Sequence, residues 1–272
     1  MKYSYLGELL IKKSLKAIFI LCISFIISIF FSPSEFLFSL DDIHISNHTG
    51  DIKMTNTNGG FFIGKIYGNC EVSSAGGPLN FDLITGSLKA TTQGGNIDVG
   101  EVKGAVSVKT TSGNIQIRAP HKHVFAETEL GEITIKSAKS VEARNIIGGD
   151  IKILGLSGYA NINSRGNILL IVQENFSGPK LCDLISWEGD ITISFAEDFG
   201  ADIEIRTPIT MDLWRETRIE SEFTFSDFKQ RYQQVEEDQI LVISTRINHG
   251  GVKINLFVDK GDIFFLKKKV KK

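Results

Sequence analysis

Apolar and polar residues alternate in short runs that recur every nine residues between residues 50 and 162. In each run, two apolar side chains stand two and four residues after a common starting position. Strict alternation is typical of a β-strand that buries one face. The apolar pairs are Ile52/Met54, Phe61/Ile63, Cys70/Val72, Leu79/Phe81, Leu88/Ala90, Ile97/Val99, Val106/Val108, Ile115/Ile117, Val124/Ala126, Ile133/Ile135, Ile151/Ile153 and Ala160/Ile162. At the Ser140 slot the pair is displaced, and Val141 with Ala143 predicts a shift of one residue.

Glycine marks the starting positions of these runs. Steps of nine from Gly50 to Gly158 give 13 positions, and 11 of them are glycine, whereas 18 glycines among 109 residues would place about two there by chance. The exceptions are Lys122 and Ser140. Glycine at the start of a strand suits a bend that needs a positive φ or a close approach of two backbones. The pattern therefore predicts a corner before each strand.

The structural unit is eighteen residues long, because alternate runs differ. One kind is followed by small polar residues, at 55–58, 73–76 and 91–94, and the other carries an extra apolar residue at Ile66, Ile84 or Val102. We therefore expect an all-β fold, a flattened β-solenoid of about 18-residue coils with two facing sheets. Its coils stack at the inter-strand spacing of about 4.8 Å.

Stacking makes residues that are eighteen apart in sequence neighbours on the outer surface. Lys53, Glu71 and Lys89 are then expected to form a column of alternating charge, which suits cross-strand pairing. A second, polar column is expected on the opposite sheet, from Asn80, Asp98 and Gln116.

The repeat becomes irregular beyond Gly158, and residues 201–249 contain no glycine. We expect residues 206–248 to form longer strands or an irregular arm with one helical turn, which caps the open end of the solenoid. The repeat returns at residues 250–254 and 261–265. The expected domain boundaries are 41–268 for the solenoid and 269–272 for a basic tail.

The first forty residues have a different pattern. An uncharged run, 17–34, follows four lysines and precedes Asp41 and Asp42, and this charge order predicts a cytoplasmic N-terminus and an exported remainder. The apolar core, residues 17–31, is long for a signal peptide and short for a membrane span of about 20 residues. Residues 1–40 are therefore expected to form one hydrophobic helix, as a signal anchor, which we favour slightly, or as a cleaved signal peptide.

Composition excludes several classes of protein. A net charge of −2 disfavours nucleic acid as a partner, and 42% hydrophobic residues exclude a disordered chain. Three cysteines are too few for a disulfide scaffold. The sequence contains no P-loop, dinucleotide fingerprint, nucleophile elbow or zinc-ligand quartet. We therefore assign no catalytic residue, no cofactor and no metal.

Two pairs of residues are weak surface candidates. His121 and His123 would share one face of a strand, but they lack a third metal ligand, so a surface corner is favoured. Glu132 and Asp150 should be neighbours on the outer face, where paired carboxylates can perform acid–base chemistry or bind calcium. A solvated face with mild repulsion is the favoured interpretation of that pair.

The cysteines and the last lysines have simple interpretations. Cys22 is apolar filler, Cys70 is a small buried hydrophobe at an inward position, and Cys182 is expected in an irregular segment. A disulfide between Cys70 and Cys182 is possible after export, but it has little support because their positions are far apart in the stack. The lysines of residues 267–272 suit a solvated terminus or, alternatively, contact with anionic polymers or lipid headgroups.

The repeats resemble a known family. Residues 94–117, GGNIDVGEVKGAVSVKTTSGNIQI, are similar to units of the bacterial β-strand-repeat domains that are labelled adhesins and are also called toastrack domains. Residues 250–268, GGVKINLFVDKGDIFFLKK, resemble the end of such domains, and the similarity covers about residues 43–268. The resemblance implies an envelope-associated β-solenoid without known catalysis, with adhesion, envelope sensing or scaffolding as its role.

The favoured function is therefore a non-enzymatic module of the bacterial cell envelope that acts in adhesin-like binding, scaffolding or envelope sensing. Its expected partners are envelope polymers, glycans or another envelope protein, with the membrane as anchor and no nucleic acid. If the signal is cleaved, the domain is secreted or periplasmic. Two alternatives stay open: an extracellular β-helical carbohydrate-active enzyme, which the sparse polar columns disfavour, and a bactofilin-like scaffold, which a capped end would disfavour.

Overall fold

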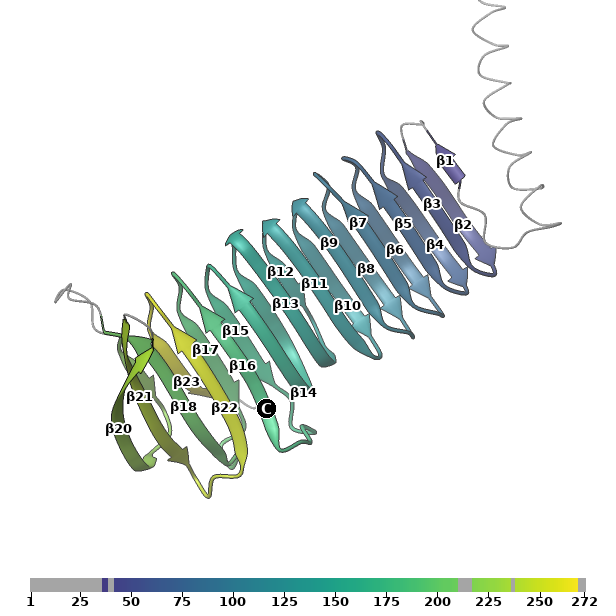
Figure 1. Ribbon diagram of the computed structural model, residues 1–272. Helices are drawn as coiled ribbons and strands as arrows, with labels where there is room; N and C mark the ends of the chain where they lie inside the picture. Colours follow the sequence, from purple (N-terminus) through teal and green to yellow (C-terminus); the bar gives the residue numbers. More distant parts are fainter. Residues whose placement is uncertain (1–35, 39–41, 210–216, 236–237, 269–272) are drawn as a thin grey trace, which may run out of the picture. The chain divides into compact units, whose positions relative to one another are not determined.

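The computed structural model describes residues 36–38, 42–209, 217–235 and 238–268. The chain divides into two units, Met1–Phe36 and Leu37–Lys272. The second unit is an all-β solenoid of about eight coils (Figure 1). The expected N-terminal helix lies outside the described residues, and so does the 269–272 tail. Of residues 1–41 only 36–38 are described, and they form a short strand, β1 (Phe36–Phe38). Within the part of the chain that is described, no helix is long and apolar enough to cross a bilayer.

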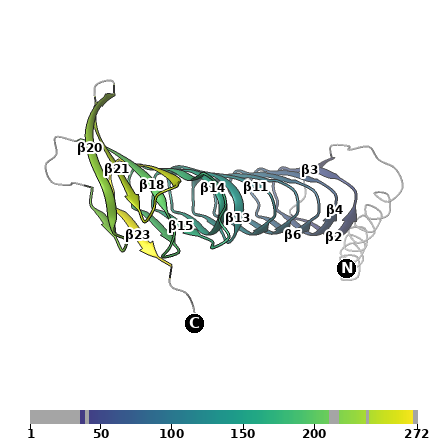
Figure 2. The same cartoon turned by 90° about the horizontal axis from the view of Figure 1, so that it is seen from below.

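Each coil contributes one strand to each of two sheets, which form the two layers seen in Figure 2. The first sheet contains β3 (Ile52–Asn56), β5 (Cys70–Ser74), β7 (Leu88–Thr92), β9 (Val106–Ser112), β11 (His123–Leu130), β13 (Ala138–Gly148) and β16 (Lys180–Ser186). The second sheet contains β2 (Ile43–Thr49), β4 (Phe61–Tyr67), β6 (Leu79–Ile84), β8 (Ile97–Val102), β10 (Ile115–Pro120), β12 (Ile133–Ile135), β15 (Ile168–Val172) and β17 (Ile191–Phe195). One long strand, β14 (Ile151–Ser164), belongs to both sheets, because its first half pairs with β12 and its second half with β13.

The register of the strands confirms the eighteen-residue coil. Ile97 pairs with Ile115, and Ile115 pairs with Ile133, in parallel strands of the second sheet. The predicted one-residue shift is also confirmed, because Val124 pairs with Val141. Later coils are longer, because a loop precedes β16: Ala160 in β14 pairs with Cys182.

The core lies between the two sheets and is formed by the predicted apolar pairs. Inward positions of the second sheet carry large side chains such as Phe61, Phe81 and Ile115, whereas the first sheet has smaller ones such as Ala90 and Val108. The rows of large side chains in the second sheet pack against the rows of small side chains in the first, and together they fill the gap of about 10 Å between two packed sheets. Each fully buried Leu, Ile or Phe stabilises the fold by about 1.5–3 kcal/mol.

The glycine pattern arises mainly from close contact between coils. A Cβ atom on Gly113 would lie 2.2 Å from the carbonyl oxygen of Gly95, one coil earlier. This contact is too short for any side chain, so the close approach, rather than a positive φ, requires glycine at this corner.

The C-terminal strands do not stack in the order of the sequence. They are β18 (Ala201–Pro208), β19 (Ile219–Ser221), β20 (Phe225–Val235), β21 (Asp238–Ile247), β22 (Val252–Val258) and β23 (Ile263–Lys267). In the first sheet β22 lies between β16 and β18, and in the second sheet β23 lies between β17 and β19. The last coil in the sequence therefore lies between two coils that precede it in the sequence.

A hairpin of two long strands closes the first sheet at this end. β21 pairs antiparallel with β18, and β20 pairs antiparallel with β21 (Figure 1). Of the two forms expected for residues 206–248, the described residues adopt the longer strands, β20 and β21, rather than an irregular arm with a helical turn. β20 is interrupted by a bulge between Ser226 and Lys229, at which Asp227 has a φ of 52°. Bulges and charged side chains on an edge strand oppose pairing with further strands.

Candidate binding surface

The outer faces of the sheets carry the predicted columns. Lys53 lies beside Glu71, and Glu71 beside Lys89, whose Nζ is 2.8 Å from the Glu71 Oε1. This hydrogen bond from Lys89 holds the pKa of Glu71 below its usual value. Exposed ion pairs of this kind contribute about 0–1 kcal/mol each, so the column adds little to the stability. The second column, Asn80, Asp98 and Gln116, is also in register.

Glu132 and Asp150 are brought together in adjacent coils, as expected, but a lysine lies between them. Lys152 Nζ is 3.0 Å from the Glu132 carboxylate and 3.8 Å from that of Asp150. The hydrogen bond to Glu132 raises the pKa of Lys152. The lysine compensates the two negative charges and so offsets the mild repulsion expected between them on this solvated face. Asp150 also accepts hydrogen bonds from the backbone and side-chain amides of Asn167, both at 3.1 Å.

This contact belongs to a ladder of side-chain oxygens that links successive coils. Each oxygen accepts the backbone N–H of the equivalent residue in the next coil, as when Asn96 accepts from Asn114 at 2.9 Å and Asn114 from Glu132 at 2.8 Å. The ladder resumes with Asp150, Asn167 and Asp190, which accepts from Asp262 at 2.8 Å. Sequence analysis missed it, although a polar residue directly after the recurring glycine was the available signal.

A second ladder lies inside the same corner, which we name the hydroxyl corner. Its buried hydroxyl groups each donate to a glycine carbonyl oxygen fifteen residues earlier, at distances of 2.6 to 3.1 Å. The donors are Ser74, Thr92, Thr110, Thr128 and Ser164. Buried polar groups need partners of this kind, so the small polar residues noted in the sequence are structural.

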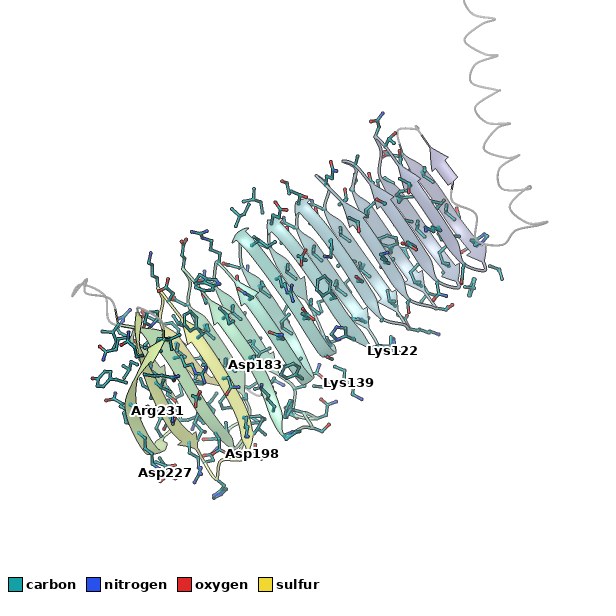
Figure 3. All side chains as sticks on the ribbon, in the orientation of Figure 1. Lys122, Lys139, Asp183, Asp198, Asp227 and Arg231 are labelled. Atoms are coloured by element: carbon teal, nitrogen blue, oxygen red, sulfur yellow. The ribbon has the colours of Figure 1, made fainter. Side chains whose placement is uncertain are left out.

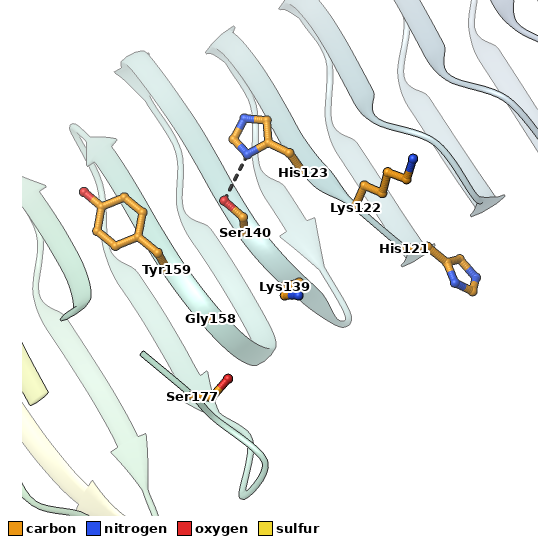
Figure 4. Close-up of a pocket in the computed structure, with 8 residues that line it drawn as sticks. All are labelled: His121, Lys122, His123, Lys139, Ser140, Gly158, Tyr159 and Ser177. Carbon is orange, nitrogen blue, oxygen red and sulfur yellow. Dashed lines mark hydrogen bonds between the residues drawn. The ribbon is translucent and has the colours of Figure 1, made fainter. Parts of the chain in front are cut away.

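His121 and His123 lie at the opposite corner and do not act as a pair. His121 stands in the turn before β11 and His123 is the first residue of that strand, which agrees with the favoured surface corner rather than with two ligands on one strand face. His121 Nε2 is 3.2 Å from Glu101 Oε1, whereas His123 Nδ1 is 3.0 Å from Ser140 Oγ. The two rings point away from one another (Figure 4). Among the described residues, no group of three or more metal-ligating side chains is present.

An open depression of about 440 Å³ lies at this second corner (Figure 4). The turn before β11, the strands β11, β13 and β14, and the loop before β16 supply its lining. None of the eight lining residues is acidic, and they are His121, Lys122, His123, Lys139, Ser140, Gly158, Tyr159 and Ser177.

Tyr159 forms a rigid wall of the depression. Its hydroxyl donates to the Asp183 carboxylate, which also accepts from Lys180 at 2.6 Å and from Asn255 at 2.8 Å. Burial raises the pKa of Asp183, but these three donors outweigh it and hold that pKa below the usual value. Burial and the neighbouring carboxylate raise the pKa of Tyr159, so the phenol stays neutral. Sequence analysis missed this network, because an irregular loop precedes β16 and hides the register.

The cysteines are not bonded to one another. Cys70 and Cys182 are both free and buried. Cys182 lies in β16, within the core, so its expected place in an irregular segment is wrong.

Comparison with known proteins places the fold in a family. The description Toastrack DUF4097 matches residues 35–194, which is more than half of the chain. The chain belongs to the Toastrack DUF4097 family. This membership agrees with the β-solenoid and with the toastrack resemblance of the repeats. Comparison with curated proteins and with solved structures gave no match.

Proposed function

We propose that this toastrack protein is a non-enzymatic binding or scaffolding module of the bacterial cell envelope. The observation that carries the proposal is the use of the candidate carboxylates in holding coils together. Asp150 accepts hydrogen bonds from the next coil, and Glu132 is compensated by Lys152. A general acid or base needs a carboxyl group that is free to exchange a proton with substrate, and both groups are instead engaged in the stack.

The location in the envelope rests on the N-terminal charge pattern. Lysines before the apolar run and acidic residues after it favour export of the solenoid, which the N-terminal segment then holds at the membrane. Adhesin-like binding and envelope sensing are both compatible with an exported rod whose outer faces carry columns of charged and polar side chains.

A self-assembling scaffold is the less favoured alternative, because of the C-terminal end. The antiparallel hairpin β20–β21 interrupts the parallel stack there, and its outer strand carries a bulge and charged side chains. End-to-end growth of a parallel stack would require another strand to pair with this edge, and bulged charged edges resist that.

A turnover assay separates a binding module from an enzyme. The full chain is incubated with acidic and neutral polysaccharides, and new reducing or unsaturated ends are measured. We expect no new ends to appear. We also expect Glu132→Gln to bind the same polymers as the wild type. Turnover that Glu132→Gln abolishes would overturn the proposal.

A second assay tests export. Whole cells that express the full chain are treated with protease, and we expect the solenoid to be digested while a cytoplasmic marker protein stays intact. Protection of the solenoid until the cells are lysed would overturn the envelope location.

A further inference from the structure

The corner that contains His121 also carries a row of lysines. Lys103 and His121 occupy equivalent places in successive coils, because their backbone N–H groups donate to Ile84 and Val102, the equivalent residues of the preceding coils. Lys122 follows directly, and Lys139 lies in the next coil, where its neighbour Ser140 pairs with His123. We name Lys103, His121, Lys122 and Lys139 the basic corner. Lys122 and Lys139 project from the same long edge of the rod (Figure 3).

These lysines differ from those on the flat faces. Lys89, Lys109 and Lys152 each form an ion pair with a glutamate of an adjacent coil. Within the described residues, neither Lys122 nor Lys139 forms an ion pair, and both are exposed. Their charge is therefore available to a ligand from solution without the loss of an existing contact.

We propose that the basic corner and its depression bind an extended acidic polysaccharide. This inference rests on the proposed function, because it names the ligand class of the binding module. Coils repeat at about 4.8 Å, so the cations recur along the corner at about the length of one sugar ring. A linear chain of uronic acids presents carboxylates at a comparable repeat, and can therefore meet cations from successive coils.

The lining of the depression favours a sugar over a lipid surface or a nucleic acid. Ser140, Ser177 and His123 provide hydrogen-bonding groups for sugar hydroxyls, and Tyr159 provides a fixed aromatic wall. Membrane insertion uses exposed apolar side chains, and no lining residue is an exposed large hydrophobic. Single-stranded nucleic acid stacks on successive aromatic rings, whereas Tyr159 is the one aromatic side chain other than histidine among the eight.

The test measures binding of polygalacturonate to the full-length chain in mild detergent. We expect saturable binding that weakens as salt rises, because the contacts are exposed ion pairs. The double variant Lys122→Ala/Lys139→Ala should weaken binding roughly thirtyfold, if each lysine contributes as one does beside an anionic surface. The matched control Lys229→Ala/Lys260→Ala removes the same charge from the hairpin and the hydroxyl corner, and should change binding less than about twofold.

Several results would overturn the inference. Absent binding of polygalacturonate, or equal losses in the two double variants, would contradict a specific basic corner. Equal binding of neutral dextran would exclude recognition of charge, and binding of short-chain phosphatidylglycerol without the polymer would favour a lipid surface. Unfolding temperatures of both double variants should match the wild type, so that a loss of binding is not a loss of folding. The proposed function is tested separately, by the turnover and export assays, so its failure can be distinguished from a failure to bind polygalacturonate.

Discussion

The hydroxyl of Thr110 lies 3.0 Å from the carbonyl oxygen of Gly95 and donates a hydrogen bond to it inside the hydroxyl corner. Both residues are buried, and the same bond recurs one coil earlier, from Thr92 to Gly77, and one coil later, from Thr128 to Gly113. The hydroxyl ladder therefore ties the last residues of each first-sheet strand to the preceding turn of the chain.

We expect Thr110→Val to destabilise the solenoid by about 1–3 kcal/mol, because it leaves a buried carbonyl group without its donor. Urea unfolding followed by circular dichroism measures the change. Thr110→Ser is the matched control, because it keeps the hydroxyl and loses one methyl group, at a cost of about 1 kcal/mol. A valine variant as stable as the serine variant would show that the bond contributes nothing.

A single methyl group at Gly113 should be more disruptive than one at Gly76. A Cβ atom at Gly113 would meet the Gly95 carbonyl oxygen at 2.2 Å, whereas a Cβ atom at Gly76 has no neighbour within 4 Å. Gly113→Ala is therefore expected to cost about 1–3 kcal/mol or more, as for overpacked cores, and Gly76→Ala less than about 0.5 kcal/mol, as for other surface changes. Thermal unfolding of the two variants compares them directly, and equal unfolding temperatures would contradict the close-contact explanation of the glycine pattern.

Removal of residues 250–272 should unfold more than the last coil. Because β22 lies between β16 and β18, its loss leaves each of these strands with one partner instead of two and separates β18 and its hairpin from the stack. We expect hydrogen exchange to show lost protection over residues 180–247 while β3 to β13 stay protected. Removal of residues 269–272 alone is the control and should leave the protection unchanged. A truncated chain that keeps protection in β18 would contradict the position of β22 between β16 and β18.

The two cysteines of the solenoid should be unreactive until the protein unfolds. Burial raises the pKa of the Cys70 thiol to about 12 and also raises that of Cys182, so neither forms the reactive thiolate at neutral pH. In a Cys22→Ser variant, we expect Ellman's reagent to modify no thiol in the native protein and both thiols in guanidinium. Fast labelling of the native protein would contradict the burial of these residues.

Stability should fall in acid partly through Asp183. The folded state holds the pKa of this carboxyl group below its usual value, so its contribution is present above the unfolded value of about 3.9 and is lost as the pH falls through the folded value. Asp183→Asn should therefore be less stable than the wild type at pH 7, with a smaller further loss below about pH 4. Asp198→Asn, at an exposed carboxylate, is the control and should follow the wild-type curve. Parallel curves for wild type and Asp183→Asn would contradict the assignment.

Most of the regular solenoid could be predicted, because strand alternation and the coil period leave a direct record in the sequence. The pairing of Ile97 with Ile115 follows from their spacing alone. The basic depression could not be predicted in this way. Tyr159 and Asp183 are 24 residues apart and separated by an irregular loop, so no period relates them. The role of Lys152 between Glu132 and Asp150 was also hidden, because spacing indicates which coils are adjacent but not which side chain turns toward which.

The sequence by itself determined the coil, its two sheets and its glycine corners. The reason is that side-chain alternation and the close approach of successive backbones restrict the residue at nearly every position. Only the tertiary structure decided the order of the last strands. β22 and β23 carry the same alternation as any other coil, so their side chains would suit the end of the stack as well as its interior. The choice is made by backbone hydrogen bonds to β16, β17 and β18 and by contacts such as that of Asp190 with the Asp262 N–H, which join residues 72 apart.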